Sequence, residues 1–321
     1  MNLVTLADIE AASERIRPAA RVTPMLEVPW PVGNGGGRLL LKCENLQPMG
    51  AFKIRGAYNM LAQLPREVLE RGVITYSSGN HGQAVALAAR TLGAPAVIVM
   101  PTTAPKVKIE GARGYGAEVT FAGTTSLDRK LRAEELARER NLTIVPPFDH
   151  PMIIAGQGTV GLEILDQCPD VSAVLVEVGG GGLSSGVSAA IKQRSPHVRV
   201  VGVEPDGAPK MKRSLEAGQV VTLDKTGSIA DGLLTIRPGD LTFQHVREFI
   251  DEVVTVPDDE MVRAIRWLFR HARLVVEPSG AVTVAALMRG LGGIDSAHGP
   301  VVAIVSGGNV EPEQYARYIN P

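Results

Sequence analysis

Four consecutive glycines at residues 179–182 are the feature of this sequence whose chemistry is easiest to predict. They stand between an apolar stretch, AVLVEV, and a helical pattern, LSSGVSAAI. Glycines lack a Cβ, so backbone N–H groups can crowd around an anion. The positive end of the following helix adds to that attraction. The loop therefore predicts phosphate binding rather than a plain tight turn.

The identity of the phosphate compound is open at this point. No GK[ST] follows the glycines, which excludes a Walker A loop. The dinucleotide pattern GxGxxG is a near miss, because its third glycine position falls on Ser184 or Ser185. Glu204 ends the next strand, where a ribose-binding acid would lie. A dinucleotide-binding domain is therefore an alternative for this loop taken alone.

A lysine in an apolar setting is the second candidate for chemistry. Lys53 stands between Phe52 and Ile54, behind a glycine and at the start of a helical pattern. Burial lowers the pKa of an amine, and a neutral lysine amine can form a Schiff base. Taken alone, a lysine in this position is more typical of a solvated helix surface.

A small polar loop, SSGNHG, follows the apolar stretch that ends at Tyr76. Such residues at a helix N-terminus suit a carboxylate, and the amide of Asn80 can both donate and accept. Ser78 alone is typical of an N-cap. For His81 we expect a hydrogen bond at the helix start rather than catalysis. The six histidines are scattered without an HExxH pattern, so no catalytic metal cluster is predicted.

Short apolar stretches alternate with helical patterns along the chain, which is typical of a doubly wound α/β fold. Unbroken apolar strands suit parallel sheets, whose ligands bind beyond the carboxyl ends of the strands. The predicted strands cover residues 39–41, 73–76, 96–100, 118–121, 143–145, 173–178, 198–203 and 301–305. The predicted helices cover residues 83–91, 127–140, 184–194 and 258–271.

The 321 residues predict two domains, a large one built from 1–68 plus 149–321 and a small one from 69–148. Lys plus Arg is 33 and Asp plus Glu is 34, so the charge balance gives no case for nucleic acid or acidic lipid. Two cysteines and no apolar leader lead us to expect a cytoplasmic protein without a membrane partner.

Several segments together resemble the fold-type II pyridoxal-phosphate enzymes, closest to the branch of threonine/serine dehydratases and serine racemases. They occur in the family's order and cover nearly the whole chain, and the match is to the short form without a regulatory domain. The segments are GAFKIRGA around Lys53, SSGNHGQA around Ser78, IAGQGT at 154–159, GGGGL at 179–183, ADGL at 230–233, EPSGA at 277–281 and SGGN at 306–309.

The resemblance implies a tryptophan synthase β-like fold, with two doubly wound parallel-sheet domains and pyridoxal 5'-phosphate in the cleft between them. Lys53 would carry the cofactor as a Schiff base and take the substrate's α-proton, with Ser78 as the second catalytic residue on the opposite face. The cofactor-binding residues would be Phe52, Lys53, Asn80, Gly179, Gly180, Gly181, Gly182, Leu183, Gly232, Glu277 and Ser306. The substrate-binding residues would be Ser77, Ser78, Gly79, Asn80, His81 and Arg129.

Ser306 would meet the pyridine nitrogen of the cofactor. A serine cannot supply the charge that an aspartate would, so we expect a largely unprotonated ring and a weaker electron sink. That favours β-elimination without excluding racemisation. The resemblance thus implies an ammonia-lyase that converts L-threonine or L-serine into a 2-oxo acid, or else a serine racemase or a threo-3-hydroxyaspartate dehydratase.

The sequence departs from the family pattern at three places. Ala51 replaces a serine before the Phe-Lys pair. The family's divalent cation site maps onto Glu204, Ala208 and Lys210, where a lysine would repel the ion. We therefore expect no metal, with Lys210 either paired to Glu204 or pointing into solvent. Arg129 would contact a second substrate carboxylate or shape the pocket, unless it is a solvated helix arginine.

Other classes of protein remain alternatives. A dehydrogenase would explain the glycine loop but would leave Lys53, Ser306 and the SSGNHG loop without a role. A cysteine-synthase-like enzyme shares the fold but fits the lysine and SSGNHG segments less well. A non-catalytic amino-acid sensor would not need Lys53. The resemblance further implies a homodimer.

Overall fold

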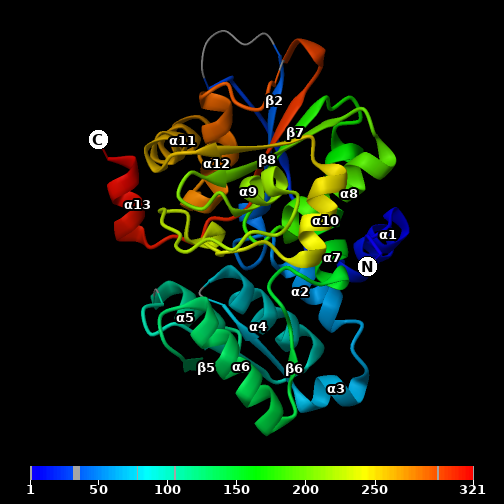
Figure 1. The fold of residues 1–321 in the computed structure, drawn as a ribbon, viewed down its shortest axis with the longest axis vertical. Coiled ribbons are helices and arrows are strands. Elements are labelled where there is room, and N and C mark those ends of the chain that lie inside the picture. Colours follow the sequence, from blue (N-terminus) through cyan, green and yellow to red (C-terminus); the bar gives the residue numbers. More distant parts are fainter. Residues whose placement is uncertain (1, 32–36, 78, 105, 295, 321) are drawn as a thin grey trace.

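The computed structural model describes residues 2–31, 37–77, 79–104, 106–294 and 296–320. Its strands form two sheets, one in each of two stacked parts of the molecule (Figure 1). The larger sheet has the order β1 (Met25–Val28), β2 (Leu39–Cys43), β10 (Val301–Val305), β7 (Ala173–Glu177), β8 (Arg199–Pro205) and β9 (Glu252–Val256). The smaller sheet has the order β5 (Glu118–Phe121), β4 (Ala96–Met100), β3 (Val73–Tyr76) and β6 (Thr143–Ile144).

Helices cover both sheets on both faces, which confirms the predicted α/β architecture of two parallel-sheet domains. Strand β1 alone runs antiparallel to its neighbour, a feature that the sequence did not indicate. The helices are α1 (Leu6–Ile16), α2 (Ile54–Leu61), α3 (Arg66–Arg71), α4 (Asn80–Leu92), α5 (Lys106–Gly114), α6 (Ser126–Arg140), α7 (Pro151–Gln167), α8 (Gly182–Arg194), α9 (Lys210–Ala217), α10 (Asp240–Phe249), α11 (Asp258–His271), α12 (Pro278–Met288) and α13 (Pro312–Ile319). Three short 3₁₀ turns are η1 (Glu44–Leu46), η2 (Asp231–Leu233) and η3 (Ser296–His298).

Alternate residues of each central strand enter different hydrophobic clusters, as a sheet buried on both faces requires. In β10, Val301 and Val305 pack in the cluster that includes α11 and α12, whereas Val302 and Ile304 pack in the cluster that includes α7 and α8. The small sheet divides in the same way, with α4 in the cluster on one face and α6 in that on the other. Because both faces are buried, these strands read as unbroken apolar stretches.

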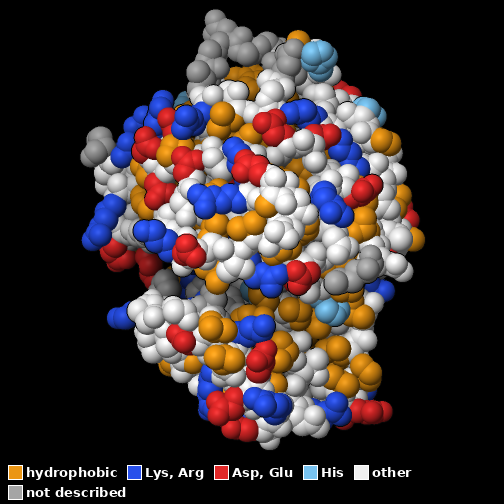
Figure 2. Space-filling view, in the orientation of Figure 1, with side chains coloured by type: hydrophobic (Ala, Val, Ile, Leu, Met, Phe, Trp, Pro, Cys, Tyr) orange, Lys and Arg blue, Asp and Glu red, His pale blue; other side chains and the backbone are white. Residues whose placement is uncertain are grey.

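The N-terminal segment packs on helices of the larger part. Helix α1 packs against α7 and α8, and the backbone N–H of Val4 donates to Nε2 of His245 at 2.9 Å. Lys, Arg, Asp and Glu side chains are interspersed over the visible face, and the outline narrows between the two parts (Figure 2). Among the described residues, no helix has both the length and the apolar character needed to cross a membrane.

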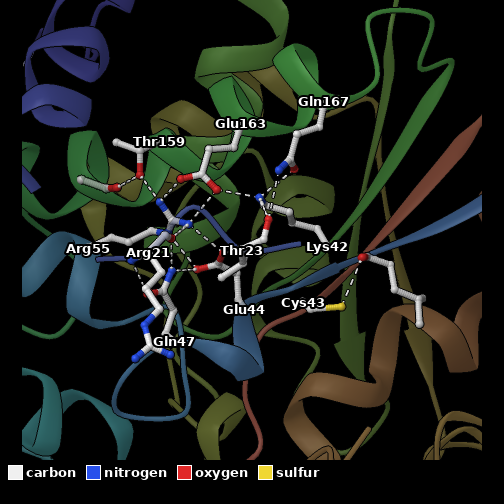
Figure 3. A network of polar contacts seen from close by, with 12 residues as sticks. Arg21, Thr23, Lys42, Cys43, Glu44, Gln47, Arg55, Thr159, Glu163 and Gln167 are labelled. Atoms are coloured by element: carbon white, nitrogen blue, oxygen red, sulfur yellow. Dashed lines mark hydrogen bonds and ion pairs between the residues drawn. The ribbon is translucent and has the colours of Figure 1, made fainter. Parts of the chain in front are cut away.

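A fully buried arginine ties the start of α2 to the larger part of the molecule (Figure 3). Arg55 donates from Nε to Glu44 at 2.7 Å and from Nη1 to Glu163 at 2.6 Å, and it reaches both carboxylates in the two-pronged manner typical of guanidinium. Lys42 also contacts Glu163, at 2.6 Å. Two positive and two negative charges therefore balance in a largely buried region, two residues after Lys53.

Replacing Arg55 with methionine should destabilise the protein strongly, because Glu44 and Glu163 would keep their charges without that partner. We expect a loss of about 3–5 kcal/mol in the free energy of unfolding, measured by urea denaturation of the cofactor-free protein. Arg66→Met is the matched control, since its pair with Glu70 is exposed, and it should cost less than about 1 kcal/mol. Equal effects of the two substitutions would contradict this account of the network.

Candidate functional site

The candidate site residues follow the carboxyl ends of parallel strands from both sheets, as predicted. Ser77 follows β3, the glycine loop follows β7, and Ser306 follows β10. The segment carrying Lys53 joins them, because the Phe52 N–H donates to the Ser306 carbonyl at 3.1 Å and Ala51 forms a bridge with Gly307. The structure thus brings residues from distant parts of the chain to one place between the two sheets.

Lys53 is the N-cap residue of α2, and its amine donates to the carbonyl of Pro147 at 2.8 Å. Phe52 lies beside it, with Nζ of Lys53 5.1 Å from the ring centroid. No carboxylate in the described part of the chain forms an ion pair with Lys53. Desolvation lowers the pKa of this amine to about 8. The surroundings of Lys53 therefore agree with the prediction that its pKa is lowered.

Three other lysines are buried, and each of them contacts a carboxylate. Lys42 pairs with Glu163, Lys108 with Asp231, and Lys210 with Glu204. A carboxylate partner favours the charged ammonium. Lys53, which is partly buried, is therefore the one of these four lysines whose surroundings best favour a neutral, nucleophilic amine.

The glycine loop begins after Val178 and ends at the first turn of α8. A Cβ on Gly180 would lie 2.3 Å from the ring of Phe148, and one on Gly181 would lie 2.7 Å from Cβ of Thr242. Gly181 also has φ +100°, a conformation that favours glycine. No larger residue fits these two positions. The loop therefore carries no side chains of its own at the N-terminus of a helix, where backbone N–H groups can bind an anion.

Lys53 and the glycine loop are held by consecutive residues. The carbonyl of Pro147 accepts from the Lys53 amine, and the ring of Phe148 packs on Gly180. Asp149 then accepts hydrogen bonds from the first backbone N–H groups of α10, at 3.0–3.1 Å. This short segment fixes the spacing between the Lys53 amine and the glycine loop. Leu183, next to the loop, is buried.

The SSGNHG loop lies at the start of α4. Ser77 accepts from the Gly79 N–H at 3.1 Å, and Gly79 is the N-cap residue. Ser78 lies outside the described residues, so its predicted catalytic role stays a prediction. Asn80 donates to Glu277 at 2.5 Å and accepts from Asn309 at 2.9 Å. Asn80 is therefore fixed between two side chains of the larger part.

Two titratable side chains of the site are buried and shifted toward their neutral forms. Burial lowers the pKa of His81 to about 3, and its Nε2 lies 3.2 Å from the Val145 carbonyl. A neutral hydrogen-bonding role for His81 agrees with our expectation. Burial also raises the pKa of Glu277, the N-cap residue of α12, to about 7. Its Oε2 has no hydrogen-bond partner among the described residues.

Arg129 and Gly232 complete the predicted set. Arg129 lies in the first turn of α6 and is only 8% exposed, so it is not a solvated surface arginine. Gly232 belongs to η2 and donates from its backbone to Ser279 at 2.9 Å.

Two charged residues near this region were not predicted. Lys108 of α5 forms an ion pair with Asp231 of η2. This pair connects the part of the molecule that holds the smaller sheet with the part that holds the larger sheet. A Cβ on Gly79 would lie 3.1 Å from the Lys108 amine. No local pattern distinguishes this lysine from its exposed neighbour Lys106, because its burial depends on the opposite domain.

Lys210 is fully buried and lies 3.0 Å from Glu204, so the predicted ion pair is present. Its ammonium also donates to three carbonyls, those of Val178, Ala208 and Leu233, at 3.0–3.1 Å. The Lys210 amine therefore contacts both Glu204 and the Ala208 carbonyl, the two groups that the sequence resemblance gives as cation ligands, and leaves no room for a divalent ion between them. Within the described residues, no three His, Cys, Asp or Glu side chains gather as a metal site.

Comparisons with known proteins agree with this geometry. The family model described as pyridoxal-phosphate dependent enzyme matches residues 16–307. The L-threonine ammonia-lyase of Geobacter sulfurreducens is 42% identical over 303 residues, which cover 94% of this chain and 75% of that protein. The serine racemase of Schizosaccharomyces pombe is 39% identical, with 99% of each chain covered. The structure of maize serine racemase has a TM-score of 0.93 at 36% identity, covering 98% of this chain and 97% of that one. Matches of this length and identity show that the chain belongs to the fold-type II pyridoxal-phosphate dependent enzymes.

Proposed function

We propose that this protein is an ammonia-lyase that converts L-threonine or L-serine into the 2-oxo acid and ammonia. One observation carries the proposal: consecutive residues Pro147 and Phe148 hold the amine of Lys53 and the glycine loop together. Such an arrangement suits a phosphorylated aldehyde. The names of the relatives support a hydroxy amino acid as the substrate.

The residues of the site fit pyridoxal phosphate. The backbone N–H groups of residues 179–183 bind its phosphate, with Phe52, Asn80, Gly232, Glu277 and Ser306 around the rest of it. When bound, this cofactor supplies an electron-accepting ring that makes the α-proton of an amino acid acidic. The amine of Lys53 takes that proton at Nζ, which its lowered pKa favours.

The loop of residues 77–81 binds the substrate carboxylate at the N-terminal end of α4. Asn80 is held by Glu277 and Asn309, so its amide is oriented before substrate arrives. His81, neutral and buried, keeps this turn in place through Val145. Arg129 contributes a cation beside the substrate or shapes its pocket.

Racemisation of serine is the second candidate activity. It needs a proton carrier on the face opposite Lys53, the role assigned to Ser78, and the similar proteins include racemases, those of Schizosaccharomyces pombe and maize among them. A dehydratase of threo-3-hydroxyaspartate is a further variant, in which Arg129 binds the second carboxylate.

We further propose a division into domains at residues 68 and 149. The strands of the small sheet lie between Val73 and Ile144, and α2 packs on both α4 and α7.

The resemblance supports a homodimer. Two buried free thiols, Cys43 and Cys168, suit the reducing conditions of the cytoplasm, where we place the protein.

The direct test of function is an assay with L-serine, L-threonine and threo-3-hydroxyaspartate that follows 2-oxo acid and D-serine together. We expect rapid release of oxo acid from L-threonine or L-serine, and its loss in Lys53→Ala. A product that is mainly D-serine would replace the lyase by a racemase. A preference for threo-3-hydroxyaspartate would assign the second carboxylate to Arg129. Absence of any turnover would refute the proposal.

Capture of pyridoxal phosphate by the cofactor-free protein should depend on pH through Lys53. The neutral amine is the nucleophile, so the rate rises with pH and should level off above about pH 8 instead of near 10.5. Stopped-flow absorbance between pH 6 and 10 measures it, with N-acetyl-lysine amide as the control for the ionisation of the cofactor itself. A rate that still climbs steeply at pH 10 would contradict the lowered pKa.

The enzyme should work without a metal ion, because the Lys210 ammonium already contacts Glu204 and three carbonyls. We expect less than about a twofold change in activity after treatment with EDTA, and no stoichiometric Mg or Ca in elemental analysis. Lys210→Ala should lower the melting temperature and regain part of it with added cations, whereas the control Lys212→Ala should do neither. A retained stoichiometric ion at Glu204 would exclude this account.

A further inference from the structure

Lys108 is a buried cation that has no role in the scheme above. It lies in the first turn of α5 and is only 4% exposed. The positive end of a helix disfavours a cation, and burial removes the water that would stabilise its charge. Its ion pair with Asp231, which belongs to the other part of the molecule, offsets both effects. The position of Lys108 therefore depends on the contact between the two parts.

The surroundings of Lys108 keep it charged, unlike Lys53. Burial opposes the ammonium form, but the carboxyl group of Asp231, together with those of Glu277 and Glu311, outweighs burial and raises the pKa of this amine. Lys108 is therefore an ammonium group at neutral pH. Such a group suits a fixed structural contact better than proton transfer.

The side chain of Lys108 lies against the backbone of the SSGNHG loop. A Cβ on Gly79 would lie 3.1 Å from both Cδ and Nζ of Lys108, so the lysine stem runs directly over this glycine. Gly79 is the N-cap residue of α4, and its carbonyl accepts from the Gly82 N–H at 3.1 Å. Lys108 therefore lies between the first turn of α4 and Asp231.

Two neighbouring contacts join the same edges of the two parts. The Val107 N–H donates to Oε1 of Glu311 at 3.0 Å. The side chain of Asn80, next to Gly79, lies between Glu277 and Asn309. The starts of α4 and α5 are thus both attached to the part that holds the larger sheet.

We propose that Lys108 is a positioning residue, which holds the loop of residues 77–81 where it binds the substrate's carboxylate. The inference rests on the proposed function, since it takes this loop as the carboxylate site. Lys108 contacts Gly79 on one side and Asp231 on the other, so the N–H groups of the loop are oriented before substrate arrives. In this role Lys108 acts through the loop and sets the affinity for the carboxylate.

Three variants separate this role from a general effect on folding. Lys108→Met keeps the apolar stem and removes the charge. The side chain of Asp231 is 44% exposed, so water can solvate it in this variant and the protein should still fold. Asp231→Asn removes the charge of the partner instead. Lys106→Met is the matched control, because Lys106 belongs to the same helix and is exposed.

The first readout is hydrogen exchange of the full chain, with and without pyridoxal phosphate, followed by mass spectrometry. We expect the backbone amides of residues 79–83 to exchange at least about tenfold faster in Lys108→Met and Asp231→Asn than in the wild type, because local opening becomes easier. Lys106→Met should match the wild type. Equal exchange in Lys108→Met and the wild type would overturn the inference.

The second readout compares two ligands that differ only in the carboxylate. L-Alanine has no group for elimination to expel, and ethylamine is L-alanine without its carboxylate. Each is titrated into the cofactor-loaded protein, and the change in visible absorbance gives its Kd. Lys108→Met should raise the Kd of L-alanine about tenfold, the factor that a lost charge-assisted hydrogen bond is typically worth, and leave that of ethylamine unchanged. An equal rise for both ligands would overturn the inference.

The kinetics of L-serine turnover give the third readout. KM should rise about tenfold in Lys108→Met while kcat changes less than about twofold, because the lost contact aids the bound substrate and the transition state alike. The double variant with Asp231→Asn should be no worse than Lys108→Met, since the two residues act as one pair. A fall in kcat at constant KM would overturn the inference. A wild type without turnover would refute the proposed function, whereas the exchange rates would still decide whether Lys108 holds the loop.

Discussion

The charge balance around Arg55 is the constraint on which the rest of the site depends. Arg55 is buried between Glu44 and Glu163, and Lys42 completes the set (Figure 3). A guanidinium in that position reaches its partners in one geometry only, because each fork of N–H groups must meet a carboxylate. Lys53 stands two residues earlier in the same segment, so the contacts of Arg55 also fix the position of Lys53. The reactive amine can therefore lie without a carboxylate partner while its helix stays anchored.

Other buried charged side chains of the site hold loops in place in the same way. Lys210 contacts Glu204 and donates to three carbonyls. One of these carbonyls belongs to Val178, which directly precedes the glycine loop. Lys108 connects η2 with α5 across the two parts. In the candidate site, by contrast, burial shifts the pKa values of Lys53 and Glu277 toward favouring their neutral forms.

Local pattern was enough to predict most of the parallel strands, because strands buried on both faces are apolar throughout. It failed for β1, which is short and at the sheet edge, and for β9. Helices α7 and α12 were also missed, since helices that are apolar all round show no periodicity. The glycine loop and Lys53 could be found from sequence because they have local signatures. Lys108 and its partner Asp231 could not, because the burial of Lys108 and the ion pair itself depend on contacts between segments distant in the chain.

The central claim is that Lys53 is the residue that carries pyridoxal phosphate. The most direct test is to reduce the cofactor-loaded protein with borohydride, digest it, and locate the pyridoxyl group by mass spectrometry. We predict the label on the peptide that contains Lys53 and not on those containing Lys42, Lys108 or Lys210, which are buried and paired with carboxylates. A label on any of these three, or no stable label, would contradict the account.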